Sequence, residues 1–219
     1  MPSNLEQAHA NMVDNQVRGW DVLNMDVLNV LASVRRADFV APAWRHLAYM
    51  DLVLPLAHGE SMMKPVIEGR MLQALRLQAS DDVLEIGTGS GYITACMARM
   101  AQSVTSIEVH SDLAAMAQTN LNRAALTNTD IVVAEAVHAY QAERLFDVIV
   151  VTGAVASLPL RWCDWLNPRG RLFVIRGQSP SMHAYLLERQ ADGSLSETNL
   201  FDTDLPYLLH AQPAQQFTL

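Results

Sequence analysis

The chain has 219 residues, 50% of them hydrophobic, and a formal net charge of −8 at pH 7. A chain of this length can form one α/β domain with an extension, but it is too short for two large domains. The acidic balance and the lack of a Lys/Arg cluster argue against a nucleic-acid partner, because nucleic-acid binders concentrate basic residues on one face.

Residues 5–36 carry apolar side chains at helical spacing, and they predict two or three helices. The stretch 37–61 mixes prolines, aromatics and short apolar runs, which favours an extended, wrapping connection. From Pro65 to Leu77 the helical spacing returns, with Pro65 in the first turn, where proline is favoured. The N-terminal part is therefore expected to be mostly helical.

After residue 77, short β-prone runs alternate with helical patterns. Strands that are apolar on both faces and joined by helices predict a parallel sheet covered on both sides. The expected fold is a single α/β domain with a Rossmann-like, doubly wound and mostly parallel sheet, in which residues 1–64 form a helical and wrapping N-terminal extension and residues 65–219 form the core. The β-prone runs are 82–86, 104–109, 131–134, 146–151 and 172–175, the helical patterns are 93–100, 113–125 and 158–166, and a possible antiparallel edge is 184–189 with 197–202, around the turn-like Asp192-Gly193.

The segment VLEIGTGSGY, Val83 to Tyr92, is a strand that enters a glycine-rich turn and then a helix. In doubly wound sheets such a turn lies at the ligand-binding end of the strands. Gly87, Gly89 and Gly91 are evenly spaced, unlike the dinucleotide fingerprint, and no Walker-type lysine follows. Glu85 would repel a pyrophosphate, but it would suit the cationic ammonium and sulfonium groups of S-adenosylmethionine.

Acidic residues also follow the next two predicted strands. Glu108 stands about twenty residues beyond the first glycine, where a carboxylate can accept both ribose hydroxyls. Glu135 could reach the adenine edge, and Thr152 begins a small-residue loop beside the reacting end of the cofactor. The predicted residues of an S-adenosylmethionine site are Glu85, Gly87, Thr88, Gly89, Ser90, Gly91, Glu108, Val109, Glu135, Ala136 and Thr152.

Taken in order, the motifs resemble the protein-L-isoaspartate O-methyltransferase family. The resemblance spans about residues 10 to 190. It implies an S-adenosylmethionine-dependent fold with a seven-stranded sheet, methyl esterification of isoaspartyl carboxylates in damaged proteins, and S-adenosylhomocysteine as product. The segments that carry it are MVDNQVRGWDVLNMDVLNVLASVRRADFVAP, LAYMDLVLPLAHGES, VLEIGTGSGY, FDVIVVTGA and LNPRGRLFVI.

The chemistry of that family asks for little acid–base catalysis. A carboxylate is already an anionic nucleophile at neutral pH, so catalysis consists mainly of aligning it with the methyl–sulfonium axis and excluding water. The family places a short serine-containing loop, of the kind ISQP, over the methyl donor. The resemblance therefore implies that the same loop of this chain orients the acceptor carboxylate.

This chain departs from the family pattern in that loop, which reads SMMKPV over residues 61–66. The family's serine falls on Met63, while Ser61 stands two residues earlier. Ser61 and Met63 are the candidate catalytic residues, with Ser61 taking over through a small loop shift. Lys64 could hold an anionic substrate; alternatively, Met63 is ordinary apolar lining and Lys64 a solvated charge.

Two further segments differ from the family in the same way. The family's Gly-Asp-Gly after the third strand becomes Ala134-Glu135-Ala136, and its C-terminal FVPL-like segment resembles Asp204 to Leu208. The cofactor half is thus kept better than the substrate half. Methyl transfer is therefore the firmer expectation, and isoaspartyl specificity the weaker one.

Three other functions stay open from the sequence. The altered loop would permit a methyltransferase with a small-molecule acceptor. Loss of the serine would fit a non-catalytic module that binds S-adenosylmethionine. A nicotinamide oxidoreductase binds its cofactor at the same end of a similar sheet. Apolar positions among residues 20–34 would make a homodimer reasonable if they are exposed. His58, His110 and His183 are expected to be surface or structural residues.

The expected location is the cytoplasm. Cys96 and Cys163, the two cysteines of the chain, stand in apolar surroundings without metal-ligand spacing, which indicates reduced packing residues and no bound metal. The N-terminus shows no secretory signal pattern, and no apolar stretch reaches the roughly 18 residues of a membrane span. We therefore expect no membrane contact.

Overall fold

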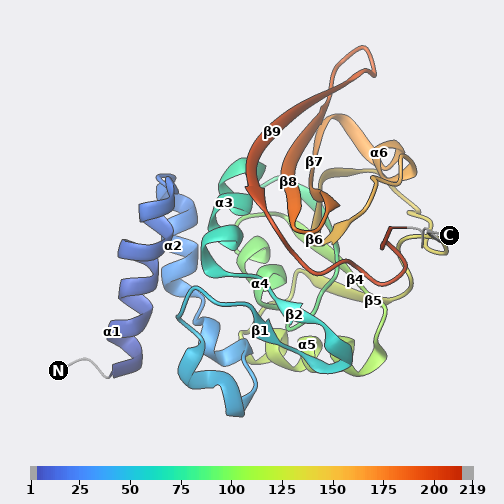
Figure 1. Cartoon of the computed structure of the whole chain (residues 1–219). Helices are drawn as coiled ribbons and strands as arrows, with labels where there is room; N and C mark the ends of the chain where they lie inside the picture. The colour runs from blue at the N-terminus through green and yellow to red at the C-terminus, as the bar shows by residue number, and fades with distance from the viewer. Residues whose placement is uncertain (1–3, 214–219) are drawn as a thin grey trace, which may run out of the picture.

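The computed structural model describes residues 4–213. They contain a seven-stranded sheet whose strands follow the order β5-β4-β3-β6-β7-β8-β9 (Figure 1). The neighbours from β5 to β7 pair in parallel, while β8 and β9 add an antiparallel edge. The expected mostly parallel α/β sheet is confirmed. Its strands are β3 (Asp82–Ile86), β4 (Ser103–Glu108), β5 (Thr129–Val133), β6 (Phe146–Val155), β7 (Leu166–Gln178), β8 (Ser181–Arg189) and β9 (Leu195–Thr203).

The strand order creates a cleft beside β3. From β3 the chain runs outward to β4 and β5, and it then returns to form β6 on the other side of β3. At such a switch point neighbouring connections diverge from the carboxyl ends of the strands, which leaves a crevice there. The residues that follow β3, β4 and β6 are therefore brought together.

Helix α3 (Pro65–Leu75) precedes β3, and three helices connect strands of the sheet: α4 (Tyr92–Ala98) between β3 and β4, α5 (Ser111–Arg123) between β4 and β5, and α6 (Arg161–Asp164) between β6 and β7. The expected helix over 158–166 is wrong in length, because α6 has only 4 residues. Leu166 already pairs with Phe146 in the sheet, and the buried Trp162 binds the carbonyl of Ala136 through its ring nitrogen. The helix therefore ends before Leu166, which already belongs to β7.

The N-terminal extension begins with the expected helices, α1 (Asn4–Asn11), the π-helix η1 (Met12–Val17), the 3-10 turn η2 (Arg18–Trp20) and α2 (Met25–Ser33). The side chain of Asn24 caps α2 by accepting bonds from the amides of Asp26 and Val27. After α2 the chain is more regular than expected: it forms η3 (Arg36–Phe39), η4 (Pro42–Leu47) and a hairpin, β1 (Leu54–Pro55) with β2 (Ser61–Met62), around the turn η5 (Ala57–Gly59).

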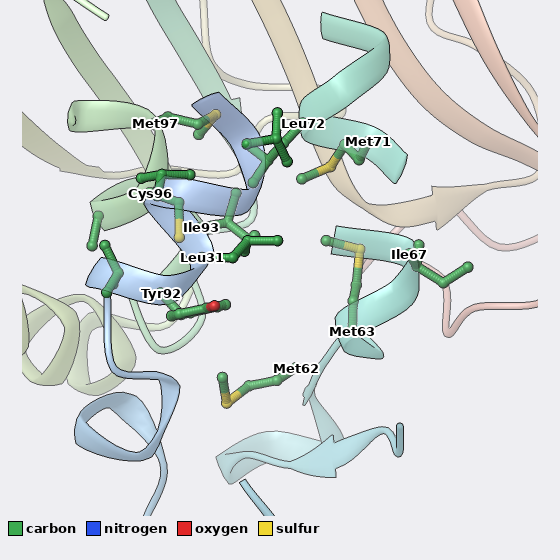
Figure 2. Packing of buried hydrophobic residues seen from close by; sticks show 14 of the residues in the cluster. Leu31, Met62, Met63, Ile67, Met71, Leu72, Tyr92, Ile93, Cys96 and Met97 are labelled. Atoms are coloured by element: carbon green, nitrogen blue, oxygen red, sulfur yellow. The ribbon is translucent and has the colours of Figure 1, made fainter. Parts of the chain in front are cut away.

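The extension shares its core with the sheet domain. Buried Leu31 of α2 belongs to the same hydrophobic cluster as Met71 and Leu72 of α3 and Ile93 of α4, and Figure 2 shows these side chains together. Burying large apolar side chains against one another is the main stabilising term in folding. No helix in residues 4–213 has the length and apolarity to cross a membrane.

Candidate cofactor and acceptor site

A cleft with about 730 Å³ of empty space, including its open mouth, lies at the carboxyl ends of β3, β4 and β6. A smaller hollow adjoins it and extends toward the glycine-rich turn. The residues that line both spaces are Leu56, Ser61, Met63, Gly87, Gly89 and Thr152.

Two glycines in the wall of the cleft have close neighbours where a side chain would stand. Gly87 has φ +101°, and a Cβ there would lie 2.5 Å from the hydroxyl of Thr152. A Cβ on Gly89, at φ +54°, would lie 3.1 Å from Leu56. Gly91 is also a predicted cofactor-binding residue, but it lines neither space. It packs instead against Ala117 of α5.

Glu108 lies where the sequence predicts a ribose ligand. Its side chain lines the cleft, and its two oxygens accept hydrogen bonds from the amides of Gly89 (2.8 Å) and His110 (3.0 Å). Each carboxylate oxygen can accept more than one bond. The turn therefore holds the carboxylate in place and leaves acceptor capacity for a pair of hydroxyls.

Glu85 lies beneath the glycine-rich turn and is fully buried. One of its oxygens accepts bonds from the hydroxyls of Thr94 (2.5 Å) and Ser106 (2.6 Å), while Oε1 has no hydrogen-bond partner among the described residues. Burial, with a smaller contribution from the charge of Glu108, raises the pKa of Glu85 to about 8. Burial therefore favours the neutral carboxyl, whereas a cation bound beside it would favour the ionised form.

This raised pKa predicts a pH-dependent stability. Folded Glu85 keeps its proton up to about pH 8, whereas the unfolded chain loses it near pH 4.5, so stability falls as the pH rises through this window. Relative to the Glu85→Gln variant, the wild type should lose about 2 kcal/mol of unfolding free energy between about pH 6 and about pH 8.5. Urea titrations of both proteins at the two pH values measure this difference. Parallel pH profiles would show that Glu85 is ionised throughout.

Residues at the far end of the cleft also line it, among them Val109, Glu135 and Ala136. The carboxylate of Glu135 accepts bonds from the amides of Val137, His138 and Ala139. Burial alone would raise the pKa of Glu135, but these backbone bonds bring it below its ordinary value. Glu135 therefore acts as a cap for the following turn, in addition to its predicted place beside an adenine.

The three other predicted residues lie around the glycine-rich turn. Thr152 donates a hydrogen bond to the carbonyl of Ile86 (3.0 Å) and contacts that of Gly87, so it ties β6 to the turn. Thr88 and Ser90 line the smaller hollow and are buried. The three side chains therefore lie together beside the glycine-rich turn.

The candidate acceptor loop covers the smaller hollow. Ser61 and Met63 line both spaces, and Met63 is buried. Figure 2 shows the side chains of Met62 and Met63 on the loop, together with that of Tyr92, the first residue of α4. Lys64 is exposed and is not among the residues that line either space, which fits a solvated charge better than a ligand.

The C-terminal segment 205–209 also lines the cleft, and it was missing from the predicted site. It pairs with the end of β6, through Ala154 to Pro206 and Leu208 to Ala154 backbone bonds of 2.9 Å each. The side chain of Leu208 then lies over Gly87 and Gly153. The only sequence signal for this role is the similarity of 204–208 to the family's FVPL-like segment.

Two histidines that the sequence treats separately meet at the mouth of the cleft. The rings of His58 and His110 are stacked, with centroids 4.1 Å apart. His58 lies 2.8 Å from the carboxylate of Asp112, and this hydrogen bond lowers the pKa of Asp112. His110 lies 3.6 Å from Glu60, whose pKa is raised by burial and by Glu108. The stack links the hairpin turn to the start of α5.

The site suits a cationic nucleoside better than a metal ion. Within residues 4–213 there is no group of three or more His, Cys, Asp or Glu side chains placed to hold a metal. Gly89 has no side chain to hinder a ligand, and the carboxylate of Glu108 can accept hydrogen bonds from hydroxyls. Glu85 Oε1 is buried and has no hydrogen-bond partner within residues 4–213. These features fit S-adenosylmethionine.

Known proteins of one methyltransferase family match this chain over most of its length. Residues 7–205 match the family model described as Protein-L-isoaspartate(D-aspartate) O-methyltransferase (PCMT). The chain is 35% identical over 193 residues to the protein-L-isoaspartate O-methyltransferase of Koribacter versatilis (88% of this chain, 86% of the relative), and 37% identical over 161 residues to that of Methanoculleus marisnigri (74% and 73%).

A solved structure shares the fold over nearly the whole length. It is a putative protein-L-isoaspartate O-methyltransferase from Plasmodium falciparum in complex with S-adenosyl-L-homocysteine, with a TM-score of 0.77, 22% identity and coverage of 91% of this chain and 97% of that one. The sheet order, the glycine-rich turn and the sequence matches agree with one another. This chain belongs to the protein-L-isoaspartate(D-aspartate) O-methyltransferase family.

Proposed function

We propose that this chain transfers the methyl group of S-adenosylmethionine to the carboxylate of an isoaspartyl residue in a damaged protein. The observation that carries the proposal is the juxtaposition of a side-chain-free glycine turn and Glu108 with the loop 61–63 in one continuous cleft. Matching relatives carry the name protein-L-isoaspartate O-methyltransferase. The cofactor would be left as S-adenosylhomocysteine.

The residues of the chain bind and orient in this reaction. S-adenosylmethionine, when bound, supplies a methyl group on a positively charged sulfur. Glu108 would hold the ribose hydroxyls, and Glu85 would accept from the cationic end, which favours its ionised form. Met63 and Leu208 would exclude water from the reacting groups, which strengthens every charge interaction there. An acceptor carboxylate needs no general base.

The loop sequence favours a second candidate function. Met63 has no hydrogen-bond donor in its side chain, so an acceptor carboxylate would rely on Ser61 or on backbone amides for orientation. A small-molecule acceptor, methylated with the same cofactor, would fit an apolar loop of this kind. A non-catalytic module that only binds the cofactor is the third candidate.

Methyl transfer to a matched peptide pair tests the proposal. One peptide carries an isoaspartyl residue and the other an ordinary aspartyl residue at the same position, with S-adenosylmethionine labelled in its methyl group. We expect a base-labile methyl ester on the isoaspartyl peptide alone. Label in a metabolite fraction but not in peptide would favour a small-molecule acceptor, and calorimetric S-adenosylhomocysteine binding without any labelled product would favour the binding module.

The Met63→Ser variant should methylate the isoaspartyl peptide faster than the wild type. A hydrogen bond to a charged group contributes about 1.5–3 kcal/mol, so kcat/KM should rise roughly 10- to 100-fold. Ser61→Ala separates the two serine positions: if Ser61 orients the acceptor in the wild type, this variant should lose activity by a similar factor. Initial rates with both variants give the answer, and no gain in Met63→Ser would mean that the acceptor carboxylate does not approach residue 63.

We propose two further properties, a cytoplasmic location and a homodimer. Both cysteines of the chain are free and buried, which suits the reducing cytoplasm. Of the large apolar residues between 20 and 34, Trp20, Leu23 and Met25 are exposed, whereas the others, such as Leu31, belong to the core. A homodimer that uses this segment would bury these three side chains.

A further inference from the structure

A buried arginine reaches the acceptor loop from the N-terminal extension. Arg36, in η3, is fully buried. Its Nη2 donates to the carbonyl of Met63 (2.6 Å), and its Nη1 donates to the carbonyl of Ala48 (2.8 Å). Its Nε and Nη2 also bind the carboxylate of Glu68, at 3.0 and 3.3 Å. The guanidinium thus joins three segments that are distant in sequence.

A buried ion pair contributes little net free energy to the stability of a core. Taking both charges out of water costs free energy that their attraction often fails to repay, and packed apolar side chains of similar size hold a core equally well. The side chains of Arg36 and Glu68 are 0% and 2% exposed. What an apolar pair could not supply is the directed bond to the Met63 carbonyl, because only a donor with fixed geometry orients a peptide group.

The same pair contacts the opposite wall of the smaller hollow. The guanidinium carbon of Arg36 lies 5.6 Å from the ring centroid of Tyr92, the residue that follows Gly91 and opens α4. Glu68 and Tyr92 both line the hollow, and the buried hydroxyl of Tyr92 has no hydrogen-bond partner among the described residues. Arg36 therefore touches both the loop that covers the hollow and the helix that leads away from the glycine-rich turn.

We propose that Arg36 and Glu68 are positioning residues for methyl transfer, which fix the Met63 peptide, and with it the loop 61–64, at one height above the methyl-donor site. This inference rests on the proposed function. Neither side chain is assigned a contact with the substrate; they act through the Met63 carbonyl. A loop that is free to move would bind the cofactor nearly as well but would align the acceptor poorly.

The double variant Arg36→Met/Glu68→Leu removes both charges together and so avoids leaving one buried charge unpaired. With the isoaspartyl peptide, kcat should fall about 10- to 100-fold, because small misplacements of orienting groups have effects of that size. The dissociation constant of S-adenosylhomocysteine, measured by calorimetry, should change by less than about threefold, since Glu108 and the glycine turn are untouched. The Arg36→Lys variant keeps the ion pair but not the fork of donors, and it should lose kcat with less loss of thermal stability.

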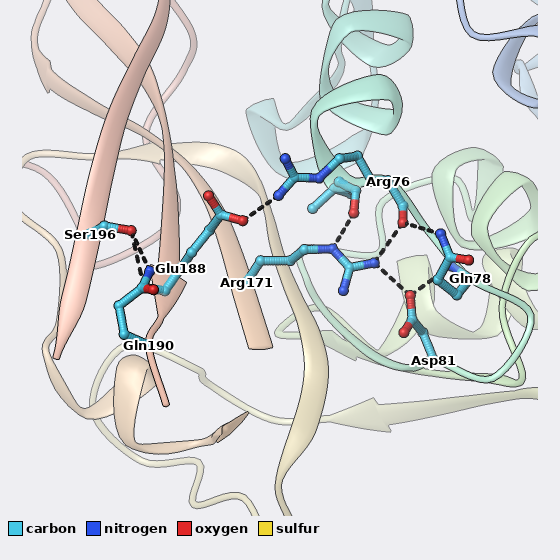
Figure 3. Close-up of polar contacts among 8 residues, drawn as sticks. Arg76, Gln78, Asp81, Arg171, Glu188, Gln190 and Ser196 are labelled. Carbon is cyan, nitrogen blue, oxygen red and sulfur yellow. Dashed lines mark hydrogen bonds and ion pairs between the residues drawn. The ribbon is translucent and has the colours of Figure 1, made fainter. Parts of the chain in front are cut away.

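A matched control lies at the other end of the sheet. Arg171 pairs with Asp81 at 2.6 Å, with side chains 12% and 9% exposed, and it also binds the carbonyls of Leu75 and Arg76 (Figure 3). The variant Arg171→Met/Asp81→Leu therefore removes the same kinds of bonds far from the cleft. It should lower the thermal midpoint to a similar extent and leave kcat unchanged. An equal loss of kcat in both double variants, or none in either, would overturn the proposal.

Hydrogen exchange separates this inference from the proposed function. With S-adenosylhomocysteine bound, the amides of residues 60–64 should exchange faster in Arg36→Met/Glu68→Leu than in the wild type or in the control variant. Unchanged protection of these amides would refute the positioning role even if activity falls. If the wild type methylates no isoaspartyl peptide while the exchange result holds, the proposed acceptor is wrong and the positioning of the loop stands.

Discussion

Replacing Gly87 with alanine is expected to abolish most cofactor binding. At φ +101° a side chain is strained, and its Cβ would lie 2.5 Å from the hydroxyl of Thr152 and 3.3 Å from Leu208. Backbone strain costs about 1–3 kcal/mol and overpacking about as much again, and the turn can escape only by shifting. The affinity for S-adenosylhomocysteine should fall at least about tenfold, together with the thermal midpoint. Calorimetric titration and thermal unfolding measure the two effects.

Gly193 provides the control for backbone strain. It lies in the turn between β8 and β9 at φ +85°, and a Cβ there would meet nothing within 4 Å. Gly193→Ala should therefore lose some stability from strain alone and bind S-adenosylhomocysteine like the wild type. If Gly87→Ala binds it equally well, the cleft beside Gly87 is not the cofactor site.

The Glu108→Ala variant should weaken S-adenosylhomocysteine binding by about 1–3 kcal/mol, roughly 5- to 150-fold. Two effects add in the same direction. The ribose hydroxyls lose charged acceptors, and the amides of Gly89 and His110 lose the carboxylate that now fixes them. Titration calorimetry at constant pH and salt measures the change.

Glu188→Ala is the matched control for this carboxylate. Glu188 lies on β8, and its ion pair with Arg76 stands apart from the cleft (Figure 3). An exposed pair of this kind contributes little to stability, typically about 0–1 kcal/mol. Its loss should leave the affinity unchanged. An equal affinity in Glu108→Ala would mean that Glu108 serves only the turn.

Local patterns predicted the central strands well. The run 82–86 coincides with β3, because a fully buried parallel strand is a short apolar segment bounded by polar turns. The runs 146–151 and 172–175 were too short, since β6 extends to Val155 and β7 begins at Leu166. These extra residues join the sheet through partners distant in sequence, such as Ala154 with Ile175, and not through their own periodicity.

Some residues of the predicted site come together because they stand at the ends of neighbouring strands. Gly87, Gly89 and Glu108 follow strand ends, so their positions follow from the topology of the sheet. The placement of Leu208 over Gly87 depends on tertiary packing, which the periodicity of the sequence does not reveal. The same holds for the bond from Arg36 to the Met63 carbonyl, and for the raised pKa of Glu85, which depends on its burial.

A crystal structure of the chain with S-adenosylhomocysteine tests the central claim most directly. The account predicts the ribose hydroxyls within hydrogen-bond distance of the Glu108 carboxylate, the amino group toward Glu85, and the sulfur facing Ser61 and Met63. S-adenosylhomocysteine bound elsewhere, or a cleft closed by Leu208 with the ligand excluded, would contradict it.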